Sequence, residues 1–384
     1  MGDVLDKKGY IRGPFGSALK RGEMKTEGIP VYEQQHAIYD NRLFRYYIDD
    51  NKFEELKRFQ VIPNDLIVSC SGTIGKTSLI RENDEKGIVS QALLILRSNS
   101  KIIEPKFLKY FLETNKGYNS LISSAGGSSQ VNIAKKQIIL DIPLVVPRLP
   151  TQHKIINFLD KISYKIELLE HKYEKYQDFK KYLMQQIFAQ KLRFDFDDEW
   201  KQYKLKELLT VKSSGISINQ LEDNTGDYPL YGASGFIKNI DFCEMDRDYI
   251  SIVKDGSGVG NLSYHEKNSS IVNTSQYLLP KDDYNIHFVY YLLQTLNLLK
   301  YVNGSSIPHI YFKDYCIEKV YVPNTLEQQK IGKLFVDIDN TLENINNSIQ
   351  VTQEFKKGLL QQMFVYFRMF ILIFVRISVA SDIS

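Results

Sequence analysis

The sequence contains one long segment twice. Residues 147–188 read PRLPTQHKIINFLDKISYKIELLEHKYEKYQDFKKYLMQQIF, and residues 323–364 read PNTLEQQKIGKLFVDIDNTLENINNSIQVTQEFKKGLLQQMF. Each residue of the first copy aligns, without a gap, with the residue 176 positions later, so that Gln152 matches Gln328. A repeat that keeps one offset over this length indicates that the chain consists of two related halves.

Each copy has the apolar spacing of a long helix that packs along a single seam. Apolar residues recur at alternating steps of four and three, which is a heptad pattern with one charged member in each copy. The first seam comprises Ile155, Leu159, Ile162, Ile166, Leu169, Tyr173, Tyr176, Lys180, Leu183 and Ile187. The second comprises Ile331, Phe335, Ile338, Leu342, Ile345, Ile349, Thr352, Lys356, Leu359 and Met363. At ~1.5 Å per residue such helices reach ~60 Å, and we expect them to pair antiparallel about a pseudo-two-fold axis.

The segments that precede the two helices also repeat each other. The first is predicted to contain a strand at 65–70, a glycine loop at 71–76, an apolar strand at 88–96, a helix at 105–113 and a strand at 138–146. The second follows the same order, with a strand at 248–253, a glycine loop at 256–260, a helix around 287–291 and a strand at 320–323. In this alignment Ser90-Gln91 matches Ser275-Gln276.

We therefore predict an α+β fold of two globular domains separated by two long antiparallel coiled-coil helices. The expected boundaries are 1–146 for the first domain, 147–193 for the first helix, 194–322 for the second domain, 323–365 for the second helix and 366–384 for an atypical apolar tail. The domains would lie at opposite ends of a rigid rod. Such a body suits a target with two surfaces at a fixed spacing, and duplex DNA, with one turn every ~34 Å, is a polymer of that kind.

The composition is that of an ordinary soluble protein, with 384 residues, 43% hydrophobic and 25% charged. Three widely spaced cysteines, Cys70, Cys243 and Cys316, predict neither a disulfide framework nor a zinc site. The N-terminal sequence lacks the pattern of a signal peptide, so we expect a cytoplasmic protein. The net charge is +3, but residues 194–322 carry 12 Lys and Arg against 18 Asp and Glu, a balance of −6. Bulk charge alone would not bring this segment to DNA.

No catalytic or metal-binding motif is recognisable in the sequence. Gly75-Lys76-Thr77 resembles the end of a phosphate-binding loop, but that motif requires glycine where Cys70 stands. The six histidines fall in no metal-ligand spacing. The Asn/Asp-Pro-Pro-aromatic tetrapeptide of amino-group DNA methyltransferases does not occur. The sequence therefore predicts a protein that is not itself an enzyme, with no catalytic residues and no metal site.

The order domain, helix, domain, helix resembles the specificity subunit of type I restriction–modification enzymes. The resemblance covers residues 1–365, and both helices close on Leu-(Met/Leu)-Gln-Gln-(Ile/Met)-Phe. The residues that open the helices and carry the resemblance are Pro147, Gln152 and Lys154-Ile155, repeated as Pro323, Gln328 and Lys330-Ile331. The resemblance implies that each globular part is a target-recognition domain that reads one half of a split DNA site.

The same resemblance implies partners and cofactors. The helices would set the spacer between the half-sites and dock two methyltransferase subunits, and motor–nuclease subunits would join them for restriction. S-adenosylmethionine, ATP and Mg²⁺ would belong to those partners, and this chain would bind no cofactor of its own. No membrane association is expected.

The internal repeat sorts the candidate DNA-binding residues into two groups. Residues shared by both halves, or lying in the glycine loops, are expected to contact phosphate, which positions a protein without specifying bases; they are Gly72, Thr73, Ser90, Gln91, Ser128, Ser129, Ser257, Ser275, Gln276, Ser305 and Ser306. Residues that differ are candidate base readers; they are Arg12, Lys20, Arg21, Arg42, Arg45, Lys76, Gln130, Asn132, Lys212, Tyr231, Ser234, Lys238, Lys254 and His309. Turn formation and strand packing are the alternative role for the first group, and simple solvation is the alternative for the second.

Two departures from the family pattern leave alternatives open. The second domain begins with Trp200-Lys201-Gln202-Tyr203-Lys204-Leu205, whereas the first begins at Met1, which predicts that a short N-terminal segment is missing. Residues 366–384 either extend the second helix or are foreign sequence after a frameshift. The chain is then either a working specificity subunit or a silent, truncated copy of one. A coiled-coil scaffold that binds proteins is the alternative from another functional class.

Overall fold

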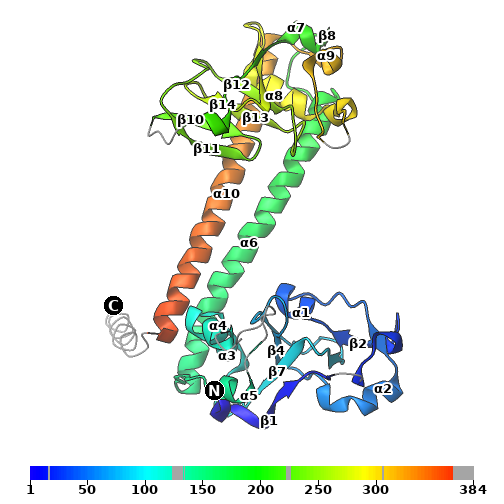
Figure 1. Cartoon of the computed structure of the whole chain (residues 1–384), viewed down its shortest axis with the longest axis vertical. Coiled ribbons are helices and arrows are strands. Elements are labelled where there is room, and N and C mark those ends of the chain that lie inside the picture. Colours follow the sequence, from blue (N-terminus) through cyan, green and yellow to red (C-terminus); the bar gives the residue numbers. More distant parts are fainter. Residues whose placement is uncertain (16–17, 123–132, 134, 222–225, 305–306, 366–384) are drawn as a thin grey trace. The chain divides into compact units, whose positions relative to one another are not determined.

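The computed structural model describes residues 1–15, 18–122, 133, 135–221, 226–304 and 307–365 (Figure 1). The chain forms two compact units, each described by itself below. Unit 1 comprises Met1–Leu168 and the chain from Ile349 onward, and unit 2 comprises Leu169–Ser348. Two long helices, α6 (Leu149–Phe188) and α10 (Thr325–Val365), each contribute one segment to unit 1 and one to unit 2.

Unit 1 is built on two small sheets. The four-stranded sheet is antiparallel and has the order β1 (Leu5–Arg12), β7 (Leu93–Ser98), β4 (Leu66–Ser69) and β5 (Thr77–Leu79). The second has the order β3 (Tyr47–Ile48), β2 (Ile29–Tyr32) and β6 (Ile88–Val89). Its helices are α1 (Gln34–Tyr39), α2 (Asp50–Glu55), α3 (Pro105–Glu113), α4 (Asn115–Ile122) and α5 (Lys136–Leu140). Short 3₁₀ turns lie at Gly2–Val4, Arg21–Glu23 and Lys57–Phe59.

Unit 2 repeats this topology strand for strand. Its antiparallel sheet has the order β9 (Leu209–Ser213), β15 (Ser275–Pro280), β12 (Tyr249–Val253) and β13 (Leu262–His265). The second sheet has the order β11 (Gly235–Ile240), β10 (Tyr228–Gly232) and β14 (Ser270–Ile271). Unit 2 adds a ladder between β8 (Lys201–Lys204) and β16 (Lys319–Val322), and helices α7 (Leu205–Leu208), α8 (Ile286–Gln294) and α9 (Phe312–Tyr315). Short 3₁₀ turns lie at Ile218–Gln220 and Leu298–Tyr301. The predicted duplication is thereby confirmed.

The long helices complete the hydrophobic core of each unit. In unit 1 the first turns of α6 and the last turns of α10 pack against α3, where Phe364 lies 4.8 Å from Phe107 between ring centroids. In unit 2 the last turns of α6 and the first turns of α10 pack against α8, where Phe188 lies 5.7 Å from Phe288. The two helix segments therefore run in opposite directions within each unit. All twenty predicted seam residues are buried or half-buried, which confirms the heptad interpretation.

The repeated glutamine has the same structural role in both helices. Gln152 accepts a hydrogen bond from the Glu104 amide at 2.8 Å and donates to the carbonyl of Pro147 at 2.8 Å. Gln328 accepts from the Asn285 amide at 2.9 Å and donates to the carbonyl of Pro323 at 2.9 Å. Both side chains are buried. Each amide group thus joins the start of a long helix to the start of the helix that it packs against, α3 or α8.

Two predicted strands are wrong. The chain at 88–96 forms β6 and β7 with a break at Ser90, because it passes from one sheet to the other there, and the Ser90 amide donates to Tyr32 at 2.8 Å. The chain at 138–146 ends helix α5 and then continues without a strand. Its counterpart β16 pairs with β8, whereas no described strand lies beside residues 143–146.

Candidate nucleic-acid interface

A glycine loop leaves the same strand in both units. In unit 1 it connects β4 to β5, and the Gly75 amide returns to the Ser69 carbonyl at 2.9 Å. In unit 2 it connects β12 to β13, and the Gly260 amide returns to the Val253 carbonyl at 2.8 Å. The loop glycines have φ between 59° and 87°, a left-handed conformation that glycine adopts at little cost. The two loops are therefore equivalent in position as well as in sequence.

Both loops present backbone amides that are not used inside the protein. Among the described residues, the amides of Gly72 and Thr73 in unit 1 and of Ser257 and Gly258 in unit 2 donate to no protein acceptor. Thr73 and Ser257 are also exposed and add a hydroxyl group to each loop. Clustered amide and hydroxyl donors in a left-handed turn form a concave site for an anion such as phosphate.

In unit 2, two further segments flank the glycine loop. The Gly256 amide donates to the Pro308 carbonyl at 2.9 Å, and the Ile310 amide donates to the Lys254 carbonyl at 2.9 Å, so the chain around His309 lies alongside the loop. The turn between β10 and β11 lies beside the loop as well. A Cβ atom placed on Gly258 would be 4.0 Å from the Cβ atom of Ala233 in that turn. The structure thus brings five predicted residues onto three neighbouring segments; they are Tyr231, Ser234, Lys254, Ser257 and His309.

The side chains on these segments differ in availability. Ser234 is exposed, whereas Tyr231 and His309 are half-buried. The Tyr231 ring lies between those of His265 and Phe236, with centroids at 4.5 and 6.2 Å. Lys254 is half-buried, and its Nζ lies 3.6 Å from Oδ2 of the neighbouring Asp255. Hydroxyl and amide donors therefore contribute more to this surface than free positive charge does.

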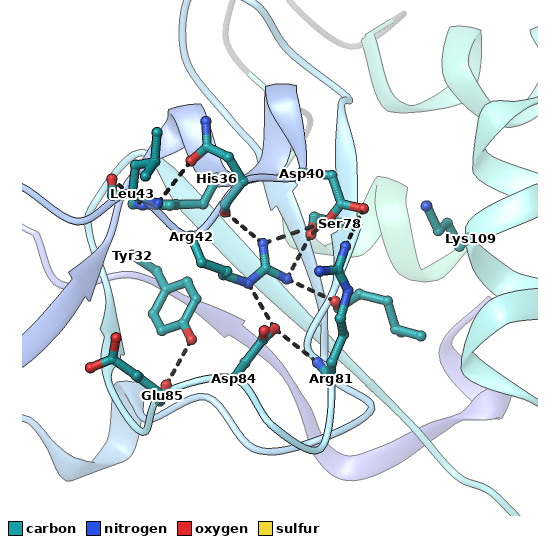
Figure 2. Close-up of polar contacts among 12 residues, drawn as sticks. Tyr32, His36, Asp40, Arg42, Leu43, Ser78, Arg81, Asp84, Glu85 and Lys109 are labelled. Atoms are coloured by element: carbon teal, nitrogen blue, oxygen red, sulfur yellow. Dashed lines mark hydrogen bonds and ion pairs between the residues drawn. The ribbon is translucent and has the colours of Figure 1, made fainter. Parts of the chain in front are cut away.

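Arg42 of unit 1 is a structural residue in a partly buried polar network (Figure 2). Its Nε contacts Asp84 at 2.7 Å, its Nη1 donates to the Asn41 carbonyl at 2.8 Å, and its Nη2 donates to Ser78 at 3.1 Å and to the Leu79 carbonyl at 3.0 Å. These contacts hold the segment after α1 against strand β5. The guanidinium group of Arg42 is thus committed to contacts within the protein.

The other cationic candidates of unit 1 divide into paired and available groups. Arg45 makes a two-pronged pair with Glu33 at 2.7 and 2.9 Å, and Arg21 donates to the Tyr46 hydroxyl at 3.3 Å. Arg12 is half-buried, and its Nη1 is buried without a hydrogen-bond partner in the described part of the chain. Lys20 and Lys76 are exposed, and neither ammonium group has an ion-pair partner among the described residues. Lys76 ends the glycine loop, where its charge adds to the free amides.

The remaining candidates lie in strands, in the connection between β6 and β7, or outside the described residues. Gln91 is exposed, Ser90 and Gln276 are half-buried, and Ser275 is buried at the start of β15. Lys212 donates to the Glu244 carbonyl at 3.0 Å, and Lys238 is half-buried on β11. Ser128, Ser129, Gln130, Asn132, Ser305 and Ser306 fall outside the described residues.

The sequence alignment of Ser90 with Ser275 is wrong by three residues. The Ser90 amide donates to Tyr32 of β2, and the equivalent bond in unit 2 runs from Val272 to Tyr231 of β10. Strand pairing gives the same alignment. Ser69 and Val253 end the strands that precede the two glycine loops; Leu93 lies opposite Ser69, and Ser275 lies opposite Val253, so that Ser275 corresponds to Leu93 and not to Ser90. The two serines therefore have different environments, and their identity in sequence reflects chance rather than a shared contact.

Comparison with known proteins places the chain in a family. The family model described as "Type I restriction modification DNA specificity domain" matches it twice, at residues 18–177 and 197–353. The chain belongs to this family of type I restriction–modification specificity proteins. The first match covers the first globular domain from residue 18 onward, the second covers nearly all of the second domain, and each includes much of the long helix that follows, so the duplicated fold corresponds to two copies of the family's unit.

Individual relatives of this specificity family are distant in sequence. The type I restriction enzyme MjaVIII specificity subunit of Methanocaldococcus jannaschii is 26% identical over 181 residues, which cover 44% of this chain and 42% of that protein. The chain thus matches less than half the length of that relative. A crystal structure of the S subunit of a type I restriction–modification system from M. genitalium has a TM-score of 0.60 at 20% identity and covers 94% of both chains. A second solved structure, from work on complex assembly and conformational transition of the type I restriction–modification system, has a TM-score of 0.55 at 14% identity, covering 94% of this chain and 95% of that one.

Two features of this specificity chain were not foreseen from its sequence. The hairpin β10–β11 exposes Phe236 and Ile237, and only its Gly-Ala-Ser-Gly turn at 232–235 signals a hairpin in advance. A groove of about 1070 Å³ lies along the unit 2 segments of α6 and α10, and Met184, Phe188 and Leu342 line it together with polar residues. In the described part of the chain, no group of His, Cys, Asp or Glu forms a metal site and no helix is long and apolar enough to cross a membrane.

Proposed function

We propose that this chain selects the DNA sequence for a type I restriction–modification enzyme and reads a bipartite duplex site, with one globular domain for each half. The observation that carries this proposal is the pair of equivalent glycine loops, each with free amides and an exposed hydroxyl group, on two copies of one sheet topology. Two copies of a phosphate-binding surface suit two segments of one DNA backbone, while the differing side chains around them supply two different base preferences.

The long helices supply the docking surface for partner subunits in this proposal. Phe179 and Phe355 occupy matching positions on α6 and α10, and both are about half exposed, at 48% and 56%. Tyr164, Tyr182 and Val351 are also exposed on these helices. Phe179 and Tyr182 are three residues apart on α6, and Val351 and Phe355 are four apart on α10, so each pair lies on one face of its helix, and exposed apolar side chains grouped in this way favour a protein partner. Two methyltransferase subunits, and motor–nuclease subunits that join them, are the partners that the family context supports.

The chemistry of the complex is assigned to those partners. S-adenosylmethionine, ATP and Mg²⁺ would be held by the methyltransferase and motor–nuclease subunits, and this chain would contribute recognition without catalysis. The site of action is the cytoplasm, where chromosomal DNA is accessible. Methylation of DNA by the purified chain alone would contradict this division of labour.

Co-expression of the chain with its methyltransferase subunit, followed by sequencing of methylated bases in the host DNA, tests the proposal. We expect a split motif of two short specified parts separated by a fixed gap. Exchange of residues 194–322 for the second domain of another family member is expected to change one part and leave the other unchanged. An assembled complex that methylates a continuous motif would contradict the bipartite assignment.

The salt dependence of binding separates this function from that of a protein scaffold. A complex that contacts DNA phosphates loses affinity steeply as salt rises, with a log–log slope that counts the contacts. Titration of the purified complex with duplex DNA at several salt concentrations measures this slope. A chain that assembles with the methyltransferase subunit but shows no DNA affinity at low salt would be a silent copy. Failure to assemble at all would favour a damaged copy or a scaffold.

A further inference from the structure

The hairpin β10–β11 is one part of unit 2 that differs from the corresponding part of unit 1. In unit 2, β10 turns through Ala233 and Ser234 directly into β11, and Gly232 pairs with Gly235 across the turn. In unit 1 the equivalent strand β2 is followed instead by helix α1 and a longer connection to β3. The neighbouring strands β14 and β6 pair with β10 and β2 in the same parallel sense. The hairpin therefore replaces a helix and a longer connection within a framework of strands that the two units share.

The hairpin presents large apolar side chains to solvent. Phe236 is 61% exposed and Ile237 is 36% exposed, and both lie on β11 where its register with β10 shifts. On the same hairpin, Leu230 and Ile240 are buried and join a small core with Ile216 and Val272. Covering the exposed surface of an apolar side chain removes it from water, which is favourable. The exposed pair is thus available for an apolar contact with a partner, while the buried pair fixes the hairpin.

The glycine loop places this apolar tip next to anion-binding groups. Ala233 at the turn lies against Gly258, whose amide is one of the two free donors of the loop, and the exposed Ser257 adjoins it. A phosphate held by these donors would bring the adjoining nucleotides to the hairpin. Contacts to phosphate fix the register of a protein on DNA, whereas contacts to base edges, including apolar contacts to the thymine methyl group, carry sequence information.

We propose that Phe236 and Ile237 are specificity-determining residues that contact base edges in the half-site read by unit 2. The neighbouring amides and hydroxyl group complement the negative phosphate, and the apolar tip supplies the base contact. Apolar recognition also suits residues 194–322, in which 12 Lys and Arg face 18 Asp and Glu, a net charge of −6. This inference rests on the proposed function and adds to it the element that reads one half-site.

The test uses the full chain in complex with its methyltransferase subunit. Two variants alter the tip: Phe236→Ser removes the ring, and Phe236→Leu keeps an apolar side chain of different shape. Ile317→Ser is the matched control, because Ile317 is 56% exposed in the same domain but lies between α9 and β16. Each purified complex selects duplexes from a random library, and the enriched motifs are compared, together with the melting temperature of each complex.

We expect both Phe236 variants to relax or change the preference at one or two adjacent base pairs of a single half-site by about five-fold or more, with the other half-site and the spacer unchanged. The Ile317→Ser complex is expected to select the parental motif. If Phe236→Ser does not assemble, the Phe236→Leu result decides. Parental motifs from assembled Phe236 variants would overturn the hairpin assignment alone. A parental complex that enriches no split motif would instead contradict the proposed function, and the hairpin assignment with it.

Discussion

Lys180 of α6 and Asp339 of α10 form a two-pronged ion pair in unit 2, with Nζ 2.6 Å from Oδ1 and 2.8 Å from Oδ2. Tyr291 of α8 donates its hydroxyl to the same carboxylate at 2.6 Å, and the lysine ammonium lies 5.0 Å from the centroid of the Tyr291 ring. Burial and then the hydrogen bond to Asp339 raise the pKa of Tyr291, so its hydroxyl keeps the proton that it donates. The charged member of the α6 seam thus joins three helices.

Replacing Lys180 with leucine is expected to lower the free energy of unfolding by about 1–3 kcal/mol, because a partly buried carboxylate loses its counter-ion. The sequence alone suggests the opposite, since leucine is the better seam residue. Lys356→Leu is the matched control: its ammonium lies 5.5 Å from the Tyr110 ring, and no carboxylate pairs with it among the described residues. Chemical unfolding of both variants measures the difference. Equal losses would show that the ion pair contributes little.

The asymmetry between the two lysines has a structural cause. In unit 1, the hydroxyl of Tyr110 donates to Asp160 at 2.5 Å, as Tyr291 does to Asp339. The other oxygen of Asp160 is taken by Lys106 of α3 at 2.7 Å. In unit 1, Lys106 of the globular domain therefore pairs with the aspartate, as Lys180 of the seam does in unit 2. The ammonium group of Lys356 lies over the ring of Tyr110 instead.

Gln328→Leu is expected to destabilise unit 2 by about 2–4 kcal/mol. The substitution leaves the half-buried Asn285 amide and the buried Pro323 carbonyl without their partners, and each unsatisfied group costs about 1–3 kcal/mol. The neighbouring Gln329 is exposed, so Gln329→Leu serves as the control and is expected to change stability by less than about 0.5 kcal/mol. Thermal unfolding measures the loss of stability in each variant. Equal losses in Gln328→Leu and Gln329→Leu would show that Gln328 has no special structural role.

The stability of unit 2 is expected to decline as the pH falls from about 6.5 toward 4. His265 is buried among tyrosine rings, a 2.9 Å hydrogen bond joins its Nε2 to Ser251 Oγ, and burial lowers its pKa to about 4. Because the pKa is lower in the folded state, the unfolded chain binds the proton first. The stabilisation is complete above the unfolded pKa of about 6.5 and is lost as pH falls through the folded value.

The loss is about 3 kcal/mol at most by this linkage. Urea unfolding at pH 7.5 and pH 5 measures it in the parental chain and in His265→Gln, which should show a flatter pH dependence. His171→Gln, at an exposed position of α6, should leave the pH dependence unchanged. A parental slope retained in His265→Gln would assign the effect to other groups.

Gly256→Ala should be destabilising by about 1–2 kcal/mol and should weaken DNA binding by the complex. The added Cβ meets nothing within 4 Å, so the cost comes from the backbone, because φ is 83° at this position. Gly215 is likewise free of neighbours but has an ordinary φ, and Gly215→Ala is expected to be neutral or slightly stabilising. Duplex titration and thermal unfolding of both variants provide the comparison. Normal DNA affinity in Gly256→Ala would argue against the loop as a phosphate contact.

The sequence predicts the framework of this protein well because the repeat offers each pattern twice. The seam of α6 and α10, the helix at Pro105–Glu113 and the strand before each glycine loop depend on local periodicity, which is visible in the residues themselves. The strand predicted at 138–146 failed because a strand requires a partner, and no local pattern shows that β8 pairs with β16 while residues 143–146 have no such neighbour.

The candidate site was harder to predict, because the availability of a side chain depends on distant residues. Arginine is a residue type that often reads bases. Arg42, however, is held within the fold by Asp84, which is more than forty residues away in the sequence. Ser90 and Ser275 are aligned in the sequence repeat, but the strand pairing shows that their positions in the two units differ by three residues. Phe236 would normally be counted as a core residue, and only the position of the hairpin shows that it faces solvent.

The contact between Phe107 and Phe364 has a consequence for the order in which the protein can be completed on the ribosome. Unit 2 is one continuous stretch, Leu169–Ser348, and can close its core once that stretch has emerged. The core of unit 1 needs Leu360, Met363 and Phe364, which are translated long after α3. The N-terminal domain, although made first, therefore finishes folding last. Until then it is the part of the nascent chain most exposed to chaperones and proteases.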